Sequence, residues 1–228
     1  FGYVEAYKSL RTNLDFMAGS MDVHTLVITS TVPEESKSNV AVNLALTLAE
    51  SGKKVALVDC DLRKPVLHRY LKAGHNVKGV SNVLSNQCTL DEALQELKEM
   101  NLTFLPAGTP PPNPSEMLSQ PQMQAMVNTL REKFDVVIFD APPVSVVTDA
   151  AVIGRYVDGA MFVVRSDYAP ADAVRGAVKK LQDAGVRVLG SVLTRYDMKK
   201  ALKGSSYAYS YAYNYNYAYE KQKADVVE

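Results

Sequence analysis

The chain has 228 residues, of which 47% are hydrophobic and 22% are charged, enough to bury a substantial core in a single globular domain. Its 25 basic and 25 acidic residues cancel, so the charge gives no argument for nucleic acid as a partner or for a general attraction to anionic membranes. The two cysteines, Cys60 and Cys88, lack metal-like spacing, which speaks against a zinc site or a disulfide framework and favours a reducing cytosol. No apolar run reaches the ~18 residues of a membrane span, and no signal peptide is visible. A start at Phe1 rather than at methionine is compatible with a piece of a longer protein, including a membrane-anchored one.

The N-terminal segment reads as a helix. Between residues 4 and 18, apolar side chains recur at helical spacing, at Val4, Tyr7, Leu10, Leu14 and Met17. Glu5, Lys8 and Arg11 lie three residues apart along another stripe of this helix. Two interpretations of the stripe remain open: a solvated face with i,i+3 ion pairing, and a surface that binds a neighbouring copy of the chain.

The next segment, HTLVITSTVPEESKSN (residues 24–39), has the layout of a phosphate-binding loop. The apolar run at residues 25–29 predicts a strand, a turn-rich loop follows, and a helical pattern begins directly after Lys37 and Ser38. Such a loop directs backbone N–H groups toward one point, the lysine adds positive charge, and the serine hydroxyl can ligate Mg²⁺. We therefore predict that the loop holds a triphosphate. The candidate contacts are Pro33, Glu34, Glu35, Ser36, Lys37, Ser38 and Asn39.

This loop departs from the general pattern G-x-x-x-x-G-K-[ST], which would place glycines at positions 31 and 36. The chain has Thr31 and Ser36 instead. A β-carbon before the lysine could cost roughly 1–2 kcal/mol if that residue is left-handed. Taken alone, the segment is equally compatible with an ordinary strand, turn and helix that expose a lysine.

Apolar runs and helical patterns alternate along the rest of the chain. The helix after the loop is expected to end at Glu50, where Ser51 and Gly52 form a C-cap. Further strands are predicted at residues 55–58, 102–105, 136–140, 160–164 and 187–193, and further helices at residues 90–97, 123–134 and 171–184. This alternation indicates an α/β fold with a mostly parallel central sheet and helices on both faces. The proline-rich segment 107–114 is expected to be a stiff connection that is neither helix nor strand.

Carboxylates follow two of the buried strands. Asp59 and Asp61 end the strand at residues 55–58, and Asp140 ends the strand at residues 136–140. Each acid alone is compatible with a helix N-cap or a turn. Because the carboxyl ends of parallel strands share one edge, however, these acids are expected to lie near Lys37, as Mg²⁺–ATP chemistry requires. One carboxylate of Asp59 and Asp61 would then be available as a base for an incoming acceptor group.

The composition changes abruptly past Lys199. Seven of the chain's 13 tyrosines alternate with small or polar residues there: Tyr207, Tyr209, Tyr211, Tyr213, Tyr215, Tyr217 and Tyr219. We predict two parts, a domain at residues 1–198 and a mobile, low-complexity tail at residues 199–228. The tail can deliver many phenols to one site as phosphate acceptors. The alternative is an aromatic tail that stacks or self-associates.

Together, the loop TSTVPEESKSN, the segments ALVDCDLRKP and VVIFDAPP, the N-terminal E-x-x-K-x-x-R and the tyrosine cluster resemble the cytoplasmic catalytic domain of bacterial tyrosine kinases of the capsule and exopolysaccharide class. The resemblance covers essentially the whole chain. In that family the three central segments are called Walker A, Walker A′ and Walker B. The resemblance implies a P-loop NTPase-like fold, ATP/ADP and Mg²⁺ as cofactors, and control of polysaccharide synthesis and export.

The resemblance also implies roles for individual residues. Lys37 and Ser38 would lie at the phosphates and Mg²⁺, Asp59 and Asp140 around the metal, and Asp61 would be the base toward tyrosine. Glu5, Lys8 and Arg11 match an E-x-x-R-x-x-R motif that joins subunits into a ring, an octamer in the family, where each tail enters a neighbour's site. A transmembrane activator, fused or separate, would hold the cytoplasmic domain at the inner face of the plasma membrane.

Two positions depart from the family pattern. Relatives carry glycine where this chain has Ser36, which bears on nucleotide affinity, and Lys8 replaces an arginine, which keeps the charge but loses bidentate geometry. Two other functions remain open: a P-loop ATPase of the partitioning or septum-positioning type, and an assembly protein whose catalysis is impaired by Ser36.

Overall fold

The structure, a computed structural model, describes residues 2–74 and 77–197. By its contacts the chain divides into a compact unit, Phe1–Thr194, and a second unit, Arg195–Glu228, which lies almost wholly outside the described residues. The predicted tail and its tyrosines are therefore outside the described part of the chain, and the boundary after residue 198 stays a prediction.

The compact unit alternates strands and helices as the apolar runs predict. Its elements are α1 (Gly2–Met21), β1 (Thr25–Ser30), α2 (Lys37–Glu50), β2 (Val55–Asp59), α3 (Leu67–Leu71), α4 (Val80–Leu84), α5 (Leu90–Ala93), β3 (Gln95–Leu97), η1 (Lys98–Met100), β4 (Leu102–Leu105), α6 (Pro114–Leu118), α7 (Pro121–Lys133), β5 (Val136–Asp140), α8 (Asp149–Gly154), β6 (Gly159–Arg165), α9 (Ala171–Asp183) and β7 (Val188–Thr194).

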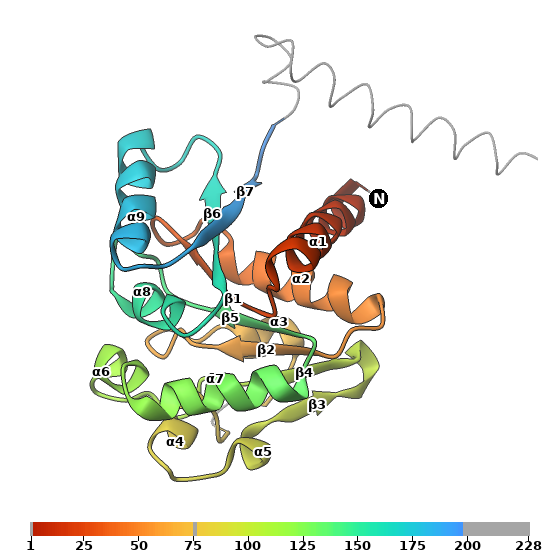
Figure 1. The fold of residues 1–228 in the computed structure, drawn as a ribbon, viewed down its shortest axis with the longest axis vertical. Helices are drawn as coiled ribbons and strands as arrows, with labels where there is room; N and C mark the ends of the chain where they lie inside the picture. The colour runs from red at the N-terminus through yellow and green to blue at the C-terminus, as the bar shows by residue number, and fades with distance from the viewer. Residues whose placement is uncertain (1, 75–76, 198–228) are drawn as a thin grey trace, which may run out of the picture. The chain divides into compact units, whose positions relative to one another are not determined.

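The strands form a seven-stranded sheet in the order β3-β4-β2-β5-β1-β6-β7, shown in Figure 1. All neighbours pair in parallel except β3, which runs antiparallel to β4. The strand before the loop, β1, pairs with β5, and β5 pairs with β2. In this register Asp140 lies opposite both Ile28 and Asp59. The fold class predicted from the sequence is therefore confirmed, and the predicted acids share one edge of the sheet.

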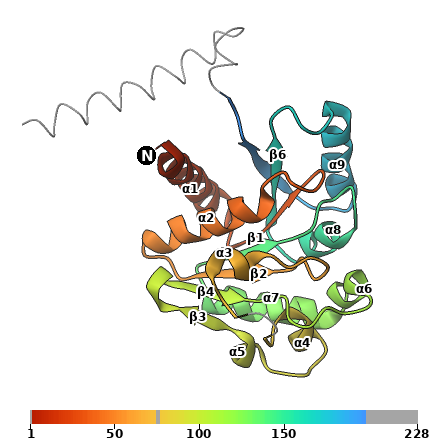
Figure 2. The same ribbon diagram turned by 180° about the vertical axis from the view of Figure 1, so that it is seen from behind.

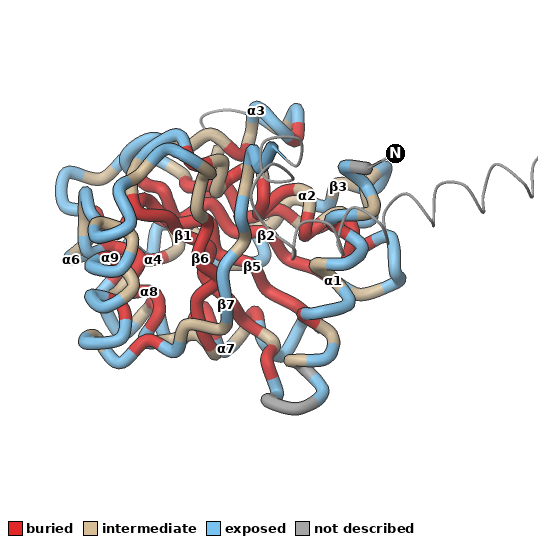
Figure 3. Tube along the Cα trace, turned by 90° about the horizontal axis from the view of Figure 1, so that it is seen from above, coloured by how far each residue is buried: buried red, intermediate tan, exposed pale blue. Residues whose placement is uncertain are grey.

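Helices cover both faces of the sheet (Figures 1 and 2). On one face α2 packs directly against the strands, and α1 packs against α2. Successive residues of β1 face opposite sides: Leu26 and Ile28 join the cluster under α2, whereas Val27 joins the cluster under α7, α8 and α9. The central strands β1, β2 and β5 are buried along their length, as Figure 3 shows, because each face is covered, whereas the edge strand β7 is partly exposed.

The predicted helix at residues 90–97 is right for residues 90–93 and wrong for residues 94–97. A Thr89–Glu92 capping box starts α5, but Leu94 adopts extended backbone angles and the helix stops at Ala93. Gln95–Leu97 then pairs antiparallel with β4. The left-handed residue Asn101 (φ 48°) turns the chain between the two strands. The tertiary pairing with β4 therefore overrides the helical pattern of the local sequence.

The proline-rich connection also ends earlier than expected. Pro114, predicted to belong to the connection, is the first residue of α6. A proline is tolerated there because the first N–H groups of a helix have no partner within the helix. Of the helices in residues 2–74 and 77–197, none is long and apolar enough to cross a bilayer.

Candidate functional site

Lys37 is the centre of a charged cluster at the carboxyl edge of the sheet. It is the first residue of α2, and its Nζ lies 3.4 Å from Oδ2 of Asp61 and 3.5 Å from Oδ1 of Asp140. Ser38 donates from Oγ to Oδ2 of Asp140 at 2.6 Å. The structure thus brings together the lysine, the serine and two of the three predicted acids.

A cavity of about 410 Å³ opens beside this cluster. It is lined by Pro33, Glu34, Ser36, Lys37, Ser38, Asn39, Asp61, Arg63, Lys64, Val66, Tyr70, Pro142, Pro143, Val146 and Val147. The N–H groups of the first turn of α2 have no partner within the helix, and the side chain of Ser36 does not cap them. An anion in this cavity would find backbone donors, the helix dipole and Lys37, so the residues present fit a phosphate group.

Two residues of the loop are left-handed. Glu34 has φ 67° and Ser36 has φ 72°. The sequence pattern predicts a conformational cost at Ser36, and the structure shows the left-handed backbone there. The strain at Glu34 was not predicted, because the general pattern does not call for glycine at that position.

Glu35 faces away from the cavity. Its carboxylate is fully buried and accepts hydrogen bonds from the amides of Val32 (2.8 Å) and Arg165 (3.2 Å). Its carbonyl oxygen accepts from Oγ1 of Thr194 at 2.9 Å. These contacts fasten the loop to the ends of β6 and β7, so the prediction that Glu35 contacts a nucleotide now rests on its backbone alone.

The opposite charges of the cluster shift the pKa values of its members. Burial by itself would lower the pKa of Lys37, but Asp140, Asp61 and Asp59 outweigh it and raise that pKa, so the amine stays protonated. Burial raises the pKa of Asp140, although Lys37 and the Ser38 hydroxyl oppose the shift. A phosphate that reached Lys37 would therefore compete with carboxylates already placed around it.

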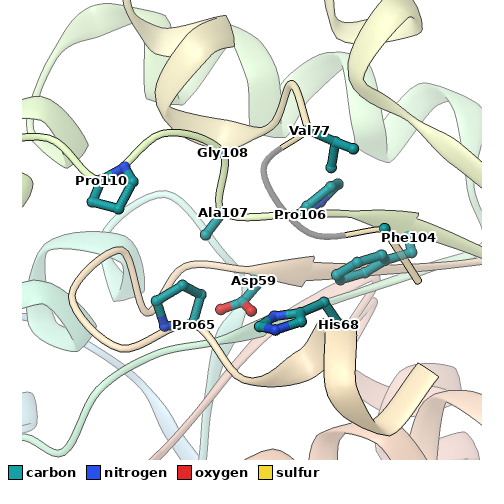
Figure 4. A pocket seen from close by; sticks show the side chains of 10 residues that line it. Asp59, Pro65, His68, Val77, Phe104, Pro106, Ala107, Gly108 and Pro110 are labelled. Carbon is teal, nitrogen blue, oxygen red and sulfur yellow. The ribbon is translucent and has the colours of Figure 1, made fainter. Parts of the chain in front are cut away.

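Asp59 lies apart from this cavity. It lines a second, small cavity together with Pro65, His68 and Phe104, shown in Figure 4. Its carboxylate accepts hydrogen bonds from the amides of Asp61 and Leu67, each at 3.2 Å. Burial, followed by repulsion from Asp140, raises the pKa of Asp59 to about 8. In this structure Asp59 therefore fixes the loop that presents Asp61, and its predicted place around a metal stays a prediction.

The residues at the cavity could hold Mg²⁺ through few protein ligands. Within the described ranges, no three His, Cys, Asp or Glu side chains are grouped so that they could hold a metal ion. Mg²⁺ usually keeps several waters and binds through one or two carboxylates plus substrate phosphates. Ser38 and Asp140, joined by their hydrogen bond, fit such a site.

Arg63 and Lys64 also line the cavity, although no role is predicted for them from the sequence. Arg63 donates from Nε to Asp149 at 3.1 Å and from Nη2 to Ser115 at 2.9 Å, which ties the loop after β2 to α8 and α6. The signal was present in the sequence, because the two basic residues follow Asp61 closely in DCDLRKP.

The stripe on α1 lies outside the cavity. Glu5 and Lys8 form an exposed ion pair at 2.8 Å, as the i,i+3 spacing predicts. Arg11 instead donates to the carbonyl oxygen of Thr47 in α2 at 3.1 Å. The contact with α2 shows that Arg11 helps to dock α1, and the role of this stripe in subunit assembly stays a prediction.

Comparisons with known proteins show which proteins this chain is similar to. Residues 35–157 match a family model described as an AAA domain. The chain is 36% identical over 203 residues to the tyrosine-protein kinase YwqD of Bacillus subtilis. The aligned region covers 89% of the chain and 84% of YwqD. The chain is also 34% identical to the tyrosine-protein kinase etk of Escherichia coli over 90% of the chain, but only 28% of that longer protein is covered.

A comparison with solved structures also finds a bacterial tyrosine kinase domain. The kinase domain of the Escherichia coli tyrosine kinase ETK matches with a TM-score of 0.80 and 33% identity, over 85% of this chain and 77% of that domain. The septum site-determining protein MinD of Pyrococcus horikoshii, complexed with Mg-ADP, matches with a TM-score of 0.66 and 24% identity, over 76% of this chain and 70% of that one. The second likeness shows a shared fold only.

We predict that Ser36→Gly strengthens ADP binding about five- to tenfold, roughly 1–1.4 kcal/mol, because removing the β-carbon lets the backbone approach phosphate. The stability of the free protein should change little, since relief of left-handed strain is offset by greater freedom of the unfolded chain. Isothermal titration calorimetry measures the affinity. Ser51→Gly, at the other end of α2 with φ −81°, is the matched control. Equal ADP affinities for Ser36→Gly and the parent chain would contradict the prediction.

We also predict that Asp59→Asn becomes more stable relative to the parent chain as the pH rises. A carboxyl whose pKa rises from 3.8 to about 8 on folding contributes stability that is complete below pH 3.8 and is lost as the pH rises through about 8. Asparagine does not titrate, so between pH 5 and pH 9 the variant should gain about 3 °C or more in melting temperature, roughly 1 kcal/mol. Thermal melts across this range, without nucleotide, give the difference. If the difference in melting temperature between the variant and the parent chain stayed constant across this pH range, Asp59 would not be held protonated.

Proposed function

The chain belongs to the family of bacterial tyrosine-protein kinases, and from this premise we propose that it transfers the γ-phosphoryl group of ATP to tyrosine side chains, including those of its own tail. The observation that carries the proposal is the cluster of Lys37, Ser38, Asp61 and Asp140 at the start of α2. Phosphoryl transfer depends mainly on positioning and on electrostatic stabilisation, and this cluster supplies both.

Each residue of the cluster has a distinct task in the proposal. Lys37 and the amides of the first turn of α2 bind the phosphates, and Ser38 and Asp140 hold Mg²⁺, which neutralises charge on the phosphate oxygens when bound. Asp61 lines the cavity near Lys37 and is the base. It accepts the phenol proton as the tyrosine oxygen bonds to the γ-phosphorus and the bond to the ADP oxygen breaks.

The tail supplies the acceptors in this proposal. Tyrosine phenols have a pKa near 10, so they need a base and close positioning, which Asp61 and the cavity provide. The apolar rim of the cavity, which includes Tyr70 and Val146, is half exposed and suits an aromatic ring. We propose that the tail of one subunit enters the cavity of another within a ring, with Glu5, Lys8 and Arg11 at the subunit contact.

The wider setting follows from the resemblance of the sequence to capsule and exopolysaccharide kinases. We propose that the chain acts in the cytoplasm at the inner face of the plasma membrane, together with a transmembrane activator. The lengths of the relatives fit either arrangement of the activator, fused or separate, because the chain spans 84% of YwqD but 28% of etk.

Labelled ATP distinguishes this proposal from its alternatives. We expect label from the γ-phosphate on tail tyrosines, and we expect Lys37→Met to reduce transfer by roughly 100-fold or more because a preorganised phosphate contact is lost. Lys179→Met, which removes an exposed lysine on α9, is the control and should retain transfer. Free phosphate without labelled protein would favour an ATPase, and neither product would favour an assembly role.

Phosphorylation of the tail should also dissociate the assembly. Each phosphate adds about −1.5 to −2 charges, so several on one short tail repel one another and the acids of the site. We expect light scattering to report a large mass before ATP treatment and a small one afterwards. An unchanged mass despite complete phosphorylation would contradict this switch.

A further inference from the structure

Asn39 connects the nucleotide cavity to the N-terminal helix. It lies in the first turn of α2, directly after Ser38, and lines the cavity. Its side-chain oxygen, Oδ1, lies 2.6 Å from the hydroxyl of Tyr3 and 3.3 Å from the hydroxyl of Tyr7, both in α1. A residue of the predicted phosphate-binding loop is thus held by two phenols from another element.

The two tyrosines form a small rigid unit. They are one helical turn apart, and their rings pack edge to face with centroids 5.0 Å apart. Tyr7 is buried and Tyr3 is half exposed, with 56% of its surface accessible. Burial raises the pKa of Tyr7, so its hydroxyl remains a proton donor at neutral pH.

Helix α1 is itself fixed along α2 by contacts further from the cavity. Arg11 donates to the carbonyl oxygen of Thr47 at 3.1 Å, and Lys53 pairs with Asp15 at 2.5 Å. Leu14 is also buried in the cluster under α2. These contacts hold Tyr3 and Tyr7 at a fixed position relative to Asn39.

In the structure, the amide oxygen of Asn39 faces the two phenols and its amide nitrogen is the other end. Both hydroxyls can donate to Oδ1, whereas Nδ2 makes no hydrogen bond to any part of the chain that the structure describes. If the amide were reversed, its oxygen lone pairs would be available to the cavity and would repel a phosphate. The observed orientation leaves a donor for a bound anion.

We propose that Tyr3 and Tyr7 are positioning residues for nucleotide binding: their hydroxyls hold Oδ1 of Asn39, so that Nδ2 is available as a hydrogen-bond donor to the nucleotide. This inference rests on the proposed function, because it requires a nucleotide in this cavity. It adds α1 to the elements that set nucleotide affinity.

The test measures ADP affinity in a double-mutant cycle on the full chain. Tyr3→Phe/Tyr7→Phe keeps both rings and removes both hydroxyls, and it should weaken ADP binding about five- to tenfold, roughly 1–1.4 kcal/mol. Asn39→Ala should cause a similar loss. The triple variant should bind no more weakly than Asn39→Ala, because the phenols act only through Asn39. A purely structural role of the tyrosines would instead give additive losses.

Tyr156→Phe is the matched control, since the Tyr156 hydroxyl donates to the carbonyl oxygen of Ser119 at 3.2 Å, outside the lining of the cavity. Its ADP affinity should equal that of the parent chain. If the double variant is poorly folded, Tyr3→Phe alone provides the test, because Tyr3 is half exposed and makes the shorter bond to Asn39. Unchanged ADP affinity on loss of the hydroxyls, or additive losses in the triple variant, would overturn this inference while leaving the proposed function intact. A parent chain that binds no ADP would overturn both.

Discussion

The site depends on the placement of one positive charge that is largely, but not fully, shielded from solvent. Lys37 starts α2 and lies between Asp61 and Asp140, which come from the ends of two strands of the sheet. A lysine in such a position must be balanced, because an unpaired buried charge is costly. Without a nucleotide the two carboxylates provide this balance. The protein thereby keeps the Lys37 amine charged at the point where phosphate would bind. When phosphate binds, Lys37 would exchange a carboxylate partner for a phosphate.

The sheet order makes this balance possible. Because β5 lies between β1 and β2, the loop after β1 and the acids that end β2 and β5 meet at one edge. The side chains of Asp59 and Asp61 nevertheless have different surroundings. Asp61 lines the cavity, whereas Asp59 holds the backbone of the loop and lines another cavity. Two acids separated by a single residue thus have different surroundings, one at the cavity proposed for the nucleotide and one bonded to the backbone of the loop.

Much of the fold could be predicted from the sequence because the buried strands are continuous apolar runs. β4, for example, occupies the predicted residues 102–105. β3 could not be predicted, because its three residues become a strand only by pairing with β4. At the site, the lysine, the serine and the acids follow from their positions after strands. The left-handed Glu34, the separate cavity at Asp59 and the contact of Asn39 with Tyr3 depend on tertiary packing, which no local pattern encodes.

In the proposed function, a nucleotide places its phosphates between the start of α2 and Lys37. A crystal structure of the chain with ADP and Mg²⁺ tests it most directly. We expect phosphate oxygens within hydrogen-bonding distance of the amides of the first turn of α2 and of Nζ of Lys37. A nucleotide bound elsewhere, with Lys37 still paired only to Asp61 and Asp140, would contradict it.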